Sequence, residues 1–139
     1  METQQEFNDT DEAILIKRYV IKRVAQIVKK NSLNSNKISF LWLDKAEGEQ
    51  RGLYPELGYK VPEPKDYEND ADYKKAAKKW REKTKPMINR VVKGTLETLK
   101  KASAITRYEE YREDGTKNPT SPVVGYKIYF DKKTTNLPG

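Results

Sequence analysis

The side chains with the clearest chemical use in this sequence are the lysines and arginines of residues 73–107. This segment holds twelve of the 28 basic residues and two of the 21 acidic residues, Glu82 and Glu97. It therefore carries a charge of +10, whereas the other residues (16 basic and 19 acidic) sum to −3. A basic segment on a mildly acidic scaffold is typical of a surface that binds a polyanion. The alternative is a lysine-rich helix that is merely solvated.

Catalytic chemistry has few residues available in this chain. The 139 residues include no cysteine and no histidine, which excludes disulfides, thiolate or imidazole metal sites and histidine-activated nucleophiles. Carboxylate-only magnesium sites and lysine or tyrosine chemistry remain as options. The acidic pairs Glu109-Glu110, in a hairpin, and Asp70-Asp72, at a helix start, are more simply surface and capping residues. The sequence therefore predicts a protein that is not an enzyme, with no catalytic residue, no metal site and no cofactor.

The length of the chain predicts one domain, which we expect at residues 9–131, with disordered ends at 1–8 and 132–139. No apolar run is longer than four residues, the length of residues 13–16. A bilayer requires about 20 such residues, and no signal peptide is recognisable. We expect a cytoplasmic protein without a membrane partner.

The first half of the chain predicts a helix and a short strand. Apolar residues recur at helical spacing up to Lys30, and the turn-rich segment 31–36 follows. Ile38, Phe40 and Trp42 then alternate, as in a short strand. Residues 45–70 contain three glycines and three prolines and predict a long loop. The apolar residues expected to hold this loop on the core are Leu53, Tyr54, Leu57 and Tyr59.

The second half predicts two helices and a hairpin. Asp70 or Asp72 is expected to cap a lysine-dense helix. Pro86 predicts a tight turn at residues 84–86 before a second helix that ends near Ser103. Residues 105–112 and 124–130 have strand composition and enclose the polar segment around Asp114-Gly115. The predicted fold class is α+β, a winged helix-turn-helix: three helices, a C-terminal β-hairpin wing and a short strand after the first helix.

A helix in the major groove needs polar and basic side chains on its exposed face. On the last helix, Arg90 suits guanine and Asn89 suits adenine. The other predicted nucleic-acid-binding residues suit phosphates or the minor groove. They are Lys74, Lys75, Lys78, Lys79 and Lys85 before and at the turn, Lys93, Lys100 and Lys101 on the last helix, and Arg112, Lys117 and Asn118 in the wing.

Aromatic residues interleaved with lysines permit a second kind of binding. Unpaired bases stack on aromatic rings above a basic surface. The candidates for base stacking are Trp80, Tyr108, Tyr111 and Tyr129. The alternative is that each of these rings belongs to the core.

The segments 91–115 and 125–130 resemble the last helix and wing of winged-helix domains, especially those of plasmid and phage replication initiators. The pattern is a helix ending in Leu-Lys-Lys, then an aromatic strand, then a Tyr-x-Ile strand. The matching residues are Leu99, Lys100, Lys101, Ile105, Tyr108, Tyr126 and Ile128. The chain is also similar to the small accessory ("middle") proteins encoded beside the cassette polymerase of staphylococcal mobile elements. These resemblances imply a role in DNA replication.

The expected function is therefore non-catalytic binding of single- or double-stranded DNA in replication of a mobile genetic element, as an initiator-type or replicase/primase accessory factor. One alternative is a sequence-specific duplex-binding transcriptional regulator that forms a homodimer through its first helix. Another is a winged-helix module that docks a polymerase or helicase.

Overall fold

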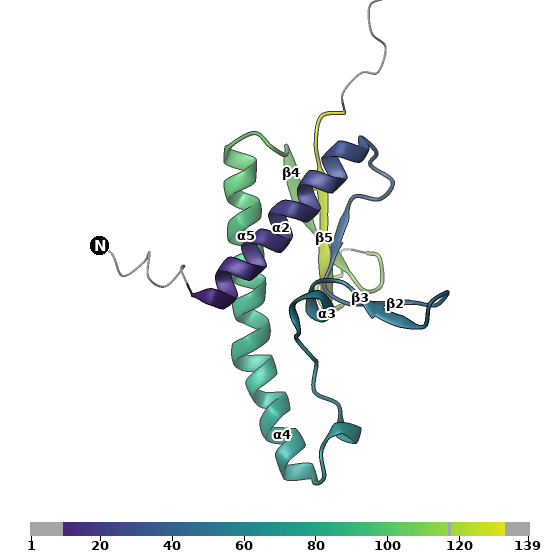
Figure 1. Cartoon of the computed structure of the whole chain (residues 1–139), viewed down its shortest axis with the longest axis vertical. Coiled ribbons are helices and arrows are strands. Elements are labelled where there is room, and N and C mark those ends of the chain that lie inside the picture. The colour runs from purple at the N-terminus through teal and green to yellow at the C-terminus, as the bar shows by residue number, and fades with distance from the viewer. Residues whose placement is uncertain (1–9, 117, 133–139) are drawn as a thin grey trace, which may run out of the picture.

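The computed structural model describes residues 10–116 and 118–132, which form a mixed α+β protein (Figure 1). Predictions for residues 1–8, Lys117 and residues 133–139 lie outside the described residues. In chain order the elements are α2 (Asp11–Lys30), β1 (Lys37–Ser39), β2 (Trp42–Asp44), β3 (Glu49–Arg51), α3 (Leu53–Leu57), η1 (Pro64–Asp66), α4 (Asp70–Lys79), η2 (Trp80–Thr84), α5 (Lys85–Lys101), β4 (Arg107–Arg112) and β5 (Val123–Tyr129).

Helix α2 forms as its periodicity predicts. The Thr10 hydroxyl caps its first turn by accepting a hydrogen bond from the amide of Ala13 at 3.1 Å. Asn31 ends the helix in the left-handed conformation at φ 54°. The buried side carries Ala13, Ile16, Val20, Val24 and Ile27.

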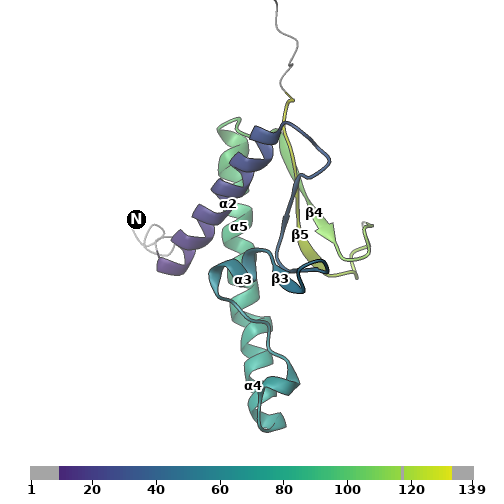
Figure 2. The same ribbon diagram turned by 45° about the vertical axis from the view of Figure 1, so that its right-hand side comes forward.

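The main sheet has the strand order β1-β5-β4, with both pairs antiparallel. The short strand predicted after the first helix is thus present, and it pairs with the C-terminal hairpin. Side chains alternate across a sheet, and the inner face of β5 carries Tyr126 and Ile128, both fully buried. Helices α2 and α5 lie on this side of the sheet only (Figure 2). The core residues Ile38, Val92 and Leu96 fill the space between them.

The predicted tight turn at residues 84–86 is wrong. Helix α4 continues through the π-helical segment η2 into α5, and Thr84 and Lys85 both keep right-handed helical dihedrals. The amide of Lys85 donates to the carbonyl of Trp80, five residues back. Proline removes one helical hydrogen bond and crowds the preceding turn, and a wider π turn directly before Pro86 relieves that crowding. The two predicted helices are therefore one continuous helix from Asp70 to Lys101.

The structure also corrects the prediction of one long loop at residues 45–70. Strand β3 pairs with β2 in a small hairpin, and α3 and η1 follow. Leu53 and Tyr54 are buried in the core, as expected, with Leu57 and Tyr59 packed against it. Trp42 does not continue the alternation of Ile38 and Phe40, because the chain leaves the main sheet at Phe40-Leu41 and Trp42 is 48% exposed in the hairpin.

Candidate nucleic-acid interface

The lysine-dense part of the long helix projects from the body of the protein. We call residues 70–84 (α4 and η2) the basic arm. It has no buried residue and extends away from α2 and the sheet (Figure 1). Asn69 caps its start by accepting from the amide of Asp72 at 2.8 Å, so the cap is neither Asp70 nor Asp72.

An aromatic contact holds the base of the arm on the core. The ring of Trp80 meets the edge of Tyr54 at 5.0 Å between centroids and lies 6.5 Å from Tyr59. Near its start, Tyr73 packs against Tyr67 of the preceding segment at 6.0 Å. These rings occupy one side of the arm, so the lysines occupy the remaining surface.

The predicted phosphate-binding residues of the arm and its junction with α5 are all exposed: Lys74, Lys75, Lys78, Lys79 and Lys85. Lys74 forms an ion pair with Asp70 at 3.0 Å, an exposed i,i+4 pair that contributes only about 0.3–0.5 kcal/mol. Arg81 and Lys83 are exposed on the same arm. The sequence prediction did not include these two residues, although the same basic run contains them.

Helix α5 continues the basic surface with the exposed residues Arg90, Lys93, Lys100 and Lys101. Glu97 lies among them and accepts a hydrogen bond from the Tyr108 hydroxyl at 2.6 Å. This bond lowers the pKa of Glu97, as do the nearby charges of Lys100, Lys101 and Lys93. An ionised carboxylate therefore interrupts the basic stripe near the C-terminal end of α5.

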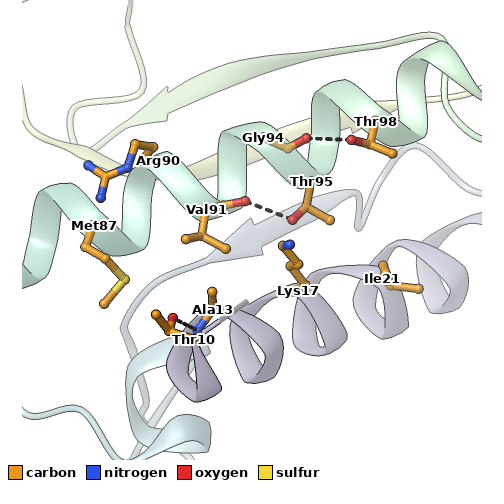
Figure 3. Close-up of a pocket in the computed structure, with 10 residues that line it drawn as sticks. All are labelled: Thr10, Ala13, Lys17, Ile21, Met87, Arg90, Val91, Gly94, Thr95 and Thr98. Carbon is orange, nitrogen blue, oxygen red and sulfur yellow. Dashed lines mark hydrogen bonds between the residues drawn. The ribbon is translucent and has the colours of Figure 1, made fainter. Parts of the chain in front are cut away.

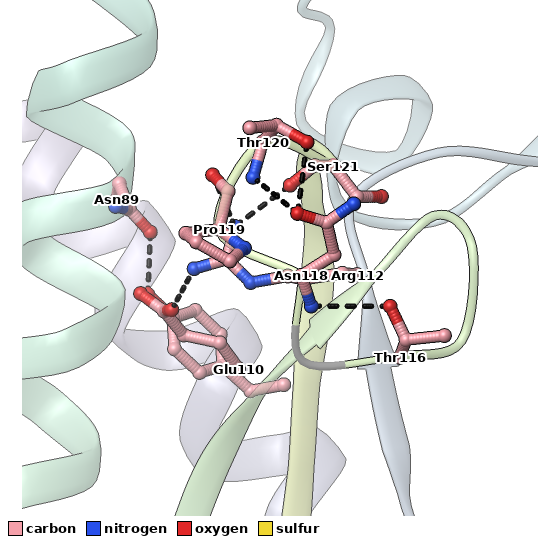
Figure 4. Close-up of polar contacts among 9 residues, drawn as sticks. Asn89, Glu110, Arg112, Thr116, Asn118, Pro119, Thr120 and Ser121 are labelled. Carbon is pink, nitrogen blue, oxygen red and sulfur yellow. Dashed lines mark hydrogen bonds and ion pairs between the residues drawn. The ribbon is translucent and has the colours of Figure 1, made fainter.

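Asn89 faces the sheet rather than the exposed stripe. Its Oδ1 accepts a hydrogen bond from the buried Tyr126 hydroxyl at 2.5 Å (Figure 4). Bidentate recognition of adenine needs both polar atoms of the amide, so this contact disfavours the predicted adenine pairing. The residue serves the contact between helix and sheet.

The two described wing residues form hydrogen bonds within the loop between β4 and β5 (Figure 4). Arg112 donates to the carbonyl of Ser121 at 2.7 Å and pairs with Glu110 at 2.8 Å. Its side chain is 19% exposed, which leaves little of the guanidinium for phosphate. The side-chain Oδ1 of Asn118 accepts from both the backbone amide and the hydroxyl of Thr120. Arg112 therefore shapes the loop, whereas Asn118 remains exposed at its tip.

The four aromatic residues predicted to stack bases separate into two pairs. Trp80 and Tyr108 pack against the core. Tyr111 and Tyr129 lie on the opposite face of the sheet, where cationic side chains sit over their rings: Lys37 Nζ is 4.0 Å from the Tyr111 centroid and Arg107 Cζ is 3.7 Å from that of Tyr129. Of the four, this second pair is placed where a base could reach a ring.

A mostly apolar groove of about 370 Å³ lies between α2 and α5 (Figure 3). Met87, Val91 and Gly94 line it from α5, and Ala13 and Ile21 line it from α2. Lys17 and Arg90 add positive charge at the groove, while the Thr95 hydroxyl is turned back to the carbonyl of Val91 at 2.8 Å. The described residues that line the groove include no carboxylate, so they supply no acid–base pair.

Within residues 10–116 and 118–132, no three acidic side chains come together in a group that could hold a metal ion. No helix of this described part is long and apolar enough to cross a membrane. Comparison with protein-family models, with curated proteins and with solved structures finds no match to this chain.

Proposed function

We propose that this protein is a non-catalytic DNA-binding protein that supports replication of a mobile genetic element. The observation that carries the proposal is the exposure of the lysines on the continuous helix from Asp70 to Lys101. At about 1.5 Å per residue this helix is roughly 45–50 Å long, so its charges span more than one turn of a duplex, about 34–36 Å. It is suited to contact several phosphates in succession.

Phosphate contact is the expected main source of affinity. Lysines that neutralise phosphates release condensed counterions, which makes binding strong at low salt and weak at high salt. The basic arm provides Lys75, Lys78 and Lys79, and no residue of the arm is buried. A DNA backbone can therefore approach these lysines without rearrangement of the protein core. The resemblance to replication initiators supports the replication role, and the sheet order β1-β5-β4 beside α5 supports a winged-helix-like arrangement.

A duplex-specific regulator is the less favoured alternative. Such a protein needs several side chains that read base edges. Asn89 is directed to Tyr126 and Arg112 to Ser121, which leaves Arg90 as the main candidate. Because few side chains are placed to contact base edges and many lysines are placed to contact phosphates, we expect DNA binding with little sequence preference.

A docking role for a polymerase or helicase is favoured by one observation, the β2–β3 hairpin. Trp42 is 48% exposed and Leu43 is 52% exposed on this hairpin. Exposed Trp is enriched at the centres of protein interfaces. The hairpin is separate from the basic arm, so DNA binding and docking are compatible.

Titration of labelled single-stranded and duplex DNA at increasing salt tests the proposal. A variant with Lys75→Gln, Lys78→Gln and Lys79→Gln should bind more weakly, and its salt slope for duplex should fall by about 0.9 for each phosphate that the variant no longer neutralises. The matched control has Lys22→Gln, Lys29→Gln and Lys30→Gln, which remove the same charge from exposed positions of α2.

An equal decrease of affinity in the two variants would show that only net charge matters and would overturn the arm as the binding site. The replication role expects binding to single strands at least as tight as to duplex. A preferred duplex sequence would instead support the regulator. Absence of binding to single-stranded and to duplex DNA at about 50 mM salt would overturn both the replication role and the regulator.

A further inference from the structure

We propose that the outer face of the main sheet binds unpaired bases of single-stranded DNA by stacking on Tyr111 and Tyr129. The outer face consists of Lys37, Ser39, Arg107, Glu109, Tyr111, Gly125, Lys127 and Tyr129. This inference rests on the proposed function, because the basic arm supplies the general attraction for DNA. It adds a second surface and a reason for preferring single strands.

The strand registers place the outer-face residues in three rows. In the first row Tyr111 lies opposite Gly125, which pairs on its other side with Ser39. In the second row Glu109 lies opposite Lys127, which pairs with Lys37. The third row pairs Arg107 with Tyr129. The two tyrosines therefore stand on neighbouring strands, four residues apart along the sheet, or about 14 Å at roughly 3.4 Å per residue. That distance suits two separate bases rather than one.

The described structure leaves this face without a covering helix. In Figure 2, α2 and α5 lie on one side of β4 and β5, and no helix lies on the other side. Tyr111, Lys127 and Tyr129 are half-buried by their neighbours in the sheet. Gly125, across from Tyr111, is buried, and the backbone of β1 at Ile38 and Ser39 lies where its side chain would stand.

Cations now occupy the positions over the rings that bases would take. Lys37 Nζ is 4.0 Å and Lys127 Nζ 5.5 Å from the Tyr111 centroid, and Arg107 Cζ is 3.7 Å from that of Tyr129. An exposed cation–π contact changes an equilibrium by about two- to fivefold. Stacking of a base on an aromatic ring changes it by about five- to 150-fold. Replacement of a cation by a base over each ring is therefore favourable, because the displaced cation can bind a phosphate of the same strand.

Glu109 positions the groups of the third row. It pairs with Arg107 at 2.9 Å and accepts from the Tyr129 hydroxyl at 3.2 Å, so it holds both side chains in place. The selectivity for single strands comes from the two rings. In a duplex the bases are stacked on each other and cannot reach the rings, whereas a single strand can turn its bases inward.

Binding of a labelled oligo(dT) to the full chain tests the inference, with an abasic strand of equal length and a duplex as comparison ligands. The double variant Tyr111→Leu/Tyr129→Leu should bind oligo(dT) at least tenfold more weakly than the wild type, with little change in duplex affinity. The matched control Tyr111→Phe/Tyr129→Phe keeps both rings and should bind within about twofold of the wild type. Circular dichroism verifies that each variant is folded.

The abasic strand gives a measurement that needs no variant. Wild-type protein should bind it at least tenfold more weakly than oligo(dT), because it has the phosphates without the bases. Equal binding of the two strands, or of the leucine and phenylalanine variants, would overturn the sheet face as a base-binding surface and leave the proposed function intact. If the wild type binds neither oligo(dT) nor duplex, the proposed function fails as well.

Discussion

The hydroxyl of Tyr126 in β5 donates a hydrogen bond to Oδ1 of Asn89 in α5 over 2.5 Å. Tyr126 is fully buried, and its burial raises the pKa of its phenol. A buried hydroxyl without a partner is costly. This bond therefore pairs the hydroxyl and joins the central strand of the sheet to the long helix.

Replacement of Asn89 should consequently affect stability more than DNA binding. Asn89→Ala leaves the Tyr126 hydroxyl unpaired and should lower the free energy of unfolding by about 1–2 kcal/mol, measured by urea denaturation. Its DNA affinity should stay within about twofold of the wild type. Arg90 is the next residue and is exposed. Arg90→Ala should therefore lower DNA affinity and leave the free energy of unfolding nearly unchanged. A large decrease of affinity with unchanged stability in Asn89→Ala would restore the base-reading role.

Two glycines should respond in opposite ways to alanine. A Cβ at Gly94 would meet nothing within 4 Å, whereas one at Gly125 would collide with the carbonyl oxygen of Ile38. Gly94→Ala should raise the free energy of unfolding by up to about 1 kcal/mol through helix propensity. Gly125→Ala should lower it by about 1–3 kcal/mol, because β1 must shift away from β5. Chemical denaturation of the two variants measures both changes in the free energy of unfolding. Destabilisation by Gly94→Ala would contradict the open space at that position.

Stability should decrease at alkaline pH. Burial raises the pKa of Tyr54 to about 12, and the hydrogen bond to Glu97 together with partial burial raises that of Tyr108 to about 12. Between the unfolded value of about 10 and these folded values, the folded state holds more protons than the unfolded state. The free energy of unfolding therefore falls as pH rises from about 10 to 12 and is unaffected by these groups below that window.

Denaturation at pH values of about 8, 10 and 11 measures this decrease. Tyr108→Phe removes one of the titrating groups and should show a smaller decrease over the same interval. An equal decrease in the wild type and this variant would indicate that Tyr108 has its ordinary pKa.

Trp80 should control the mobility of the basic arm. Its contacts with Tyr54 and Tyr59 hold the arm on the core, and no arm residue is buried. Trp80→Ala should lower stability by about 2 kcal/mol. Hydrogen exchange should accelerate in residues 70–84 more than in α5 beyond Ile88. Lys75→Ala is the control and should change neither the stability nor the hydrogen exchange of residues 70–84. Uniform acceleration of exchange across the chain in Trp80→Ala would contradict a local role of Trp80.

Local patterns in the sequence determined much of the architecture. Helical spacing with a Thr10 cap defines α2, and period-two alternation puts Tyr126 and Ile128 on one face of β5 and Lys127 and Tyr129 on the other. These features depend on residues a few positions apart, where backbone geometry alone decides which side chains share a face. The basic character of residues 73–107 is likewise visible in composition alone.

The tertiary structure decided the features that depend on distant residues. Pro86 predicts a break, but Trp80 packs on Tyr54 and a π turn absorbs the proline, so the helix continues. Asn89 and Tyr126, 37 positions apart, carry no local signal that they meet. Alternation along β4 puts Tyr108 and Tyr111 on opposite faces, but only packing decides that Tyr108 contacts Glu97 of α5 and that Lys37 lies over Tyr111. Burial depends on which elements meet across the core, and that information resides in the folded chain rather than in any short segment of it.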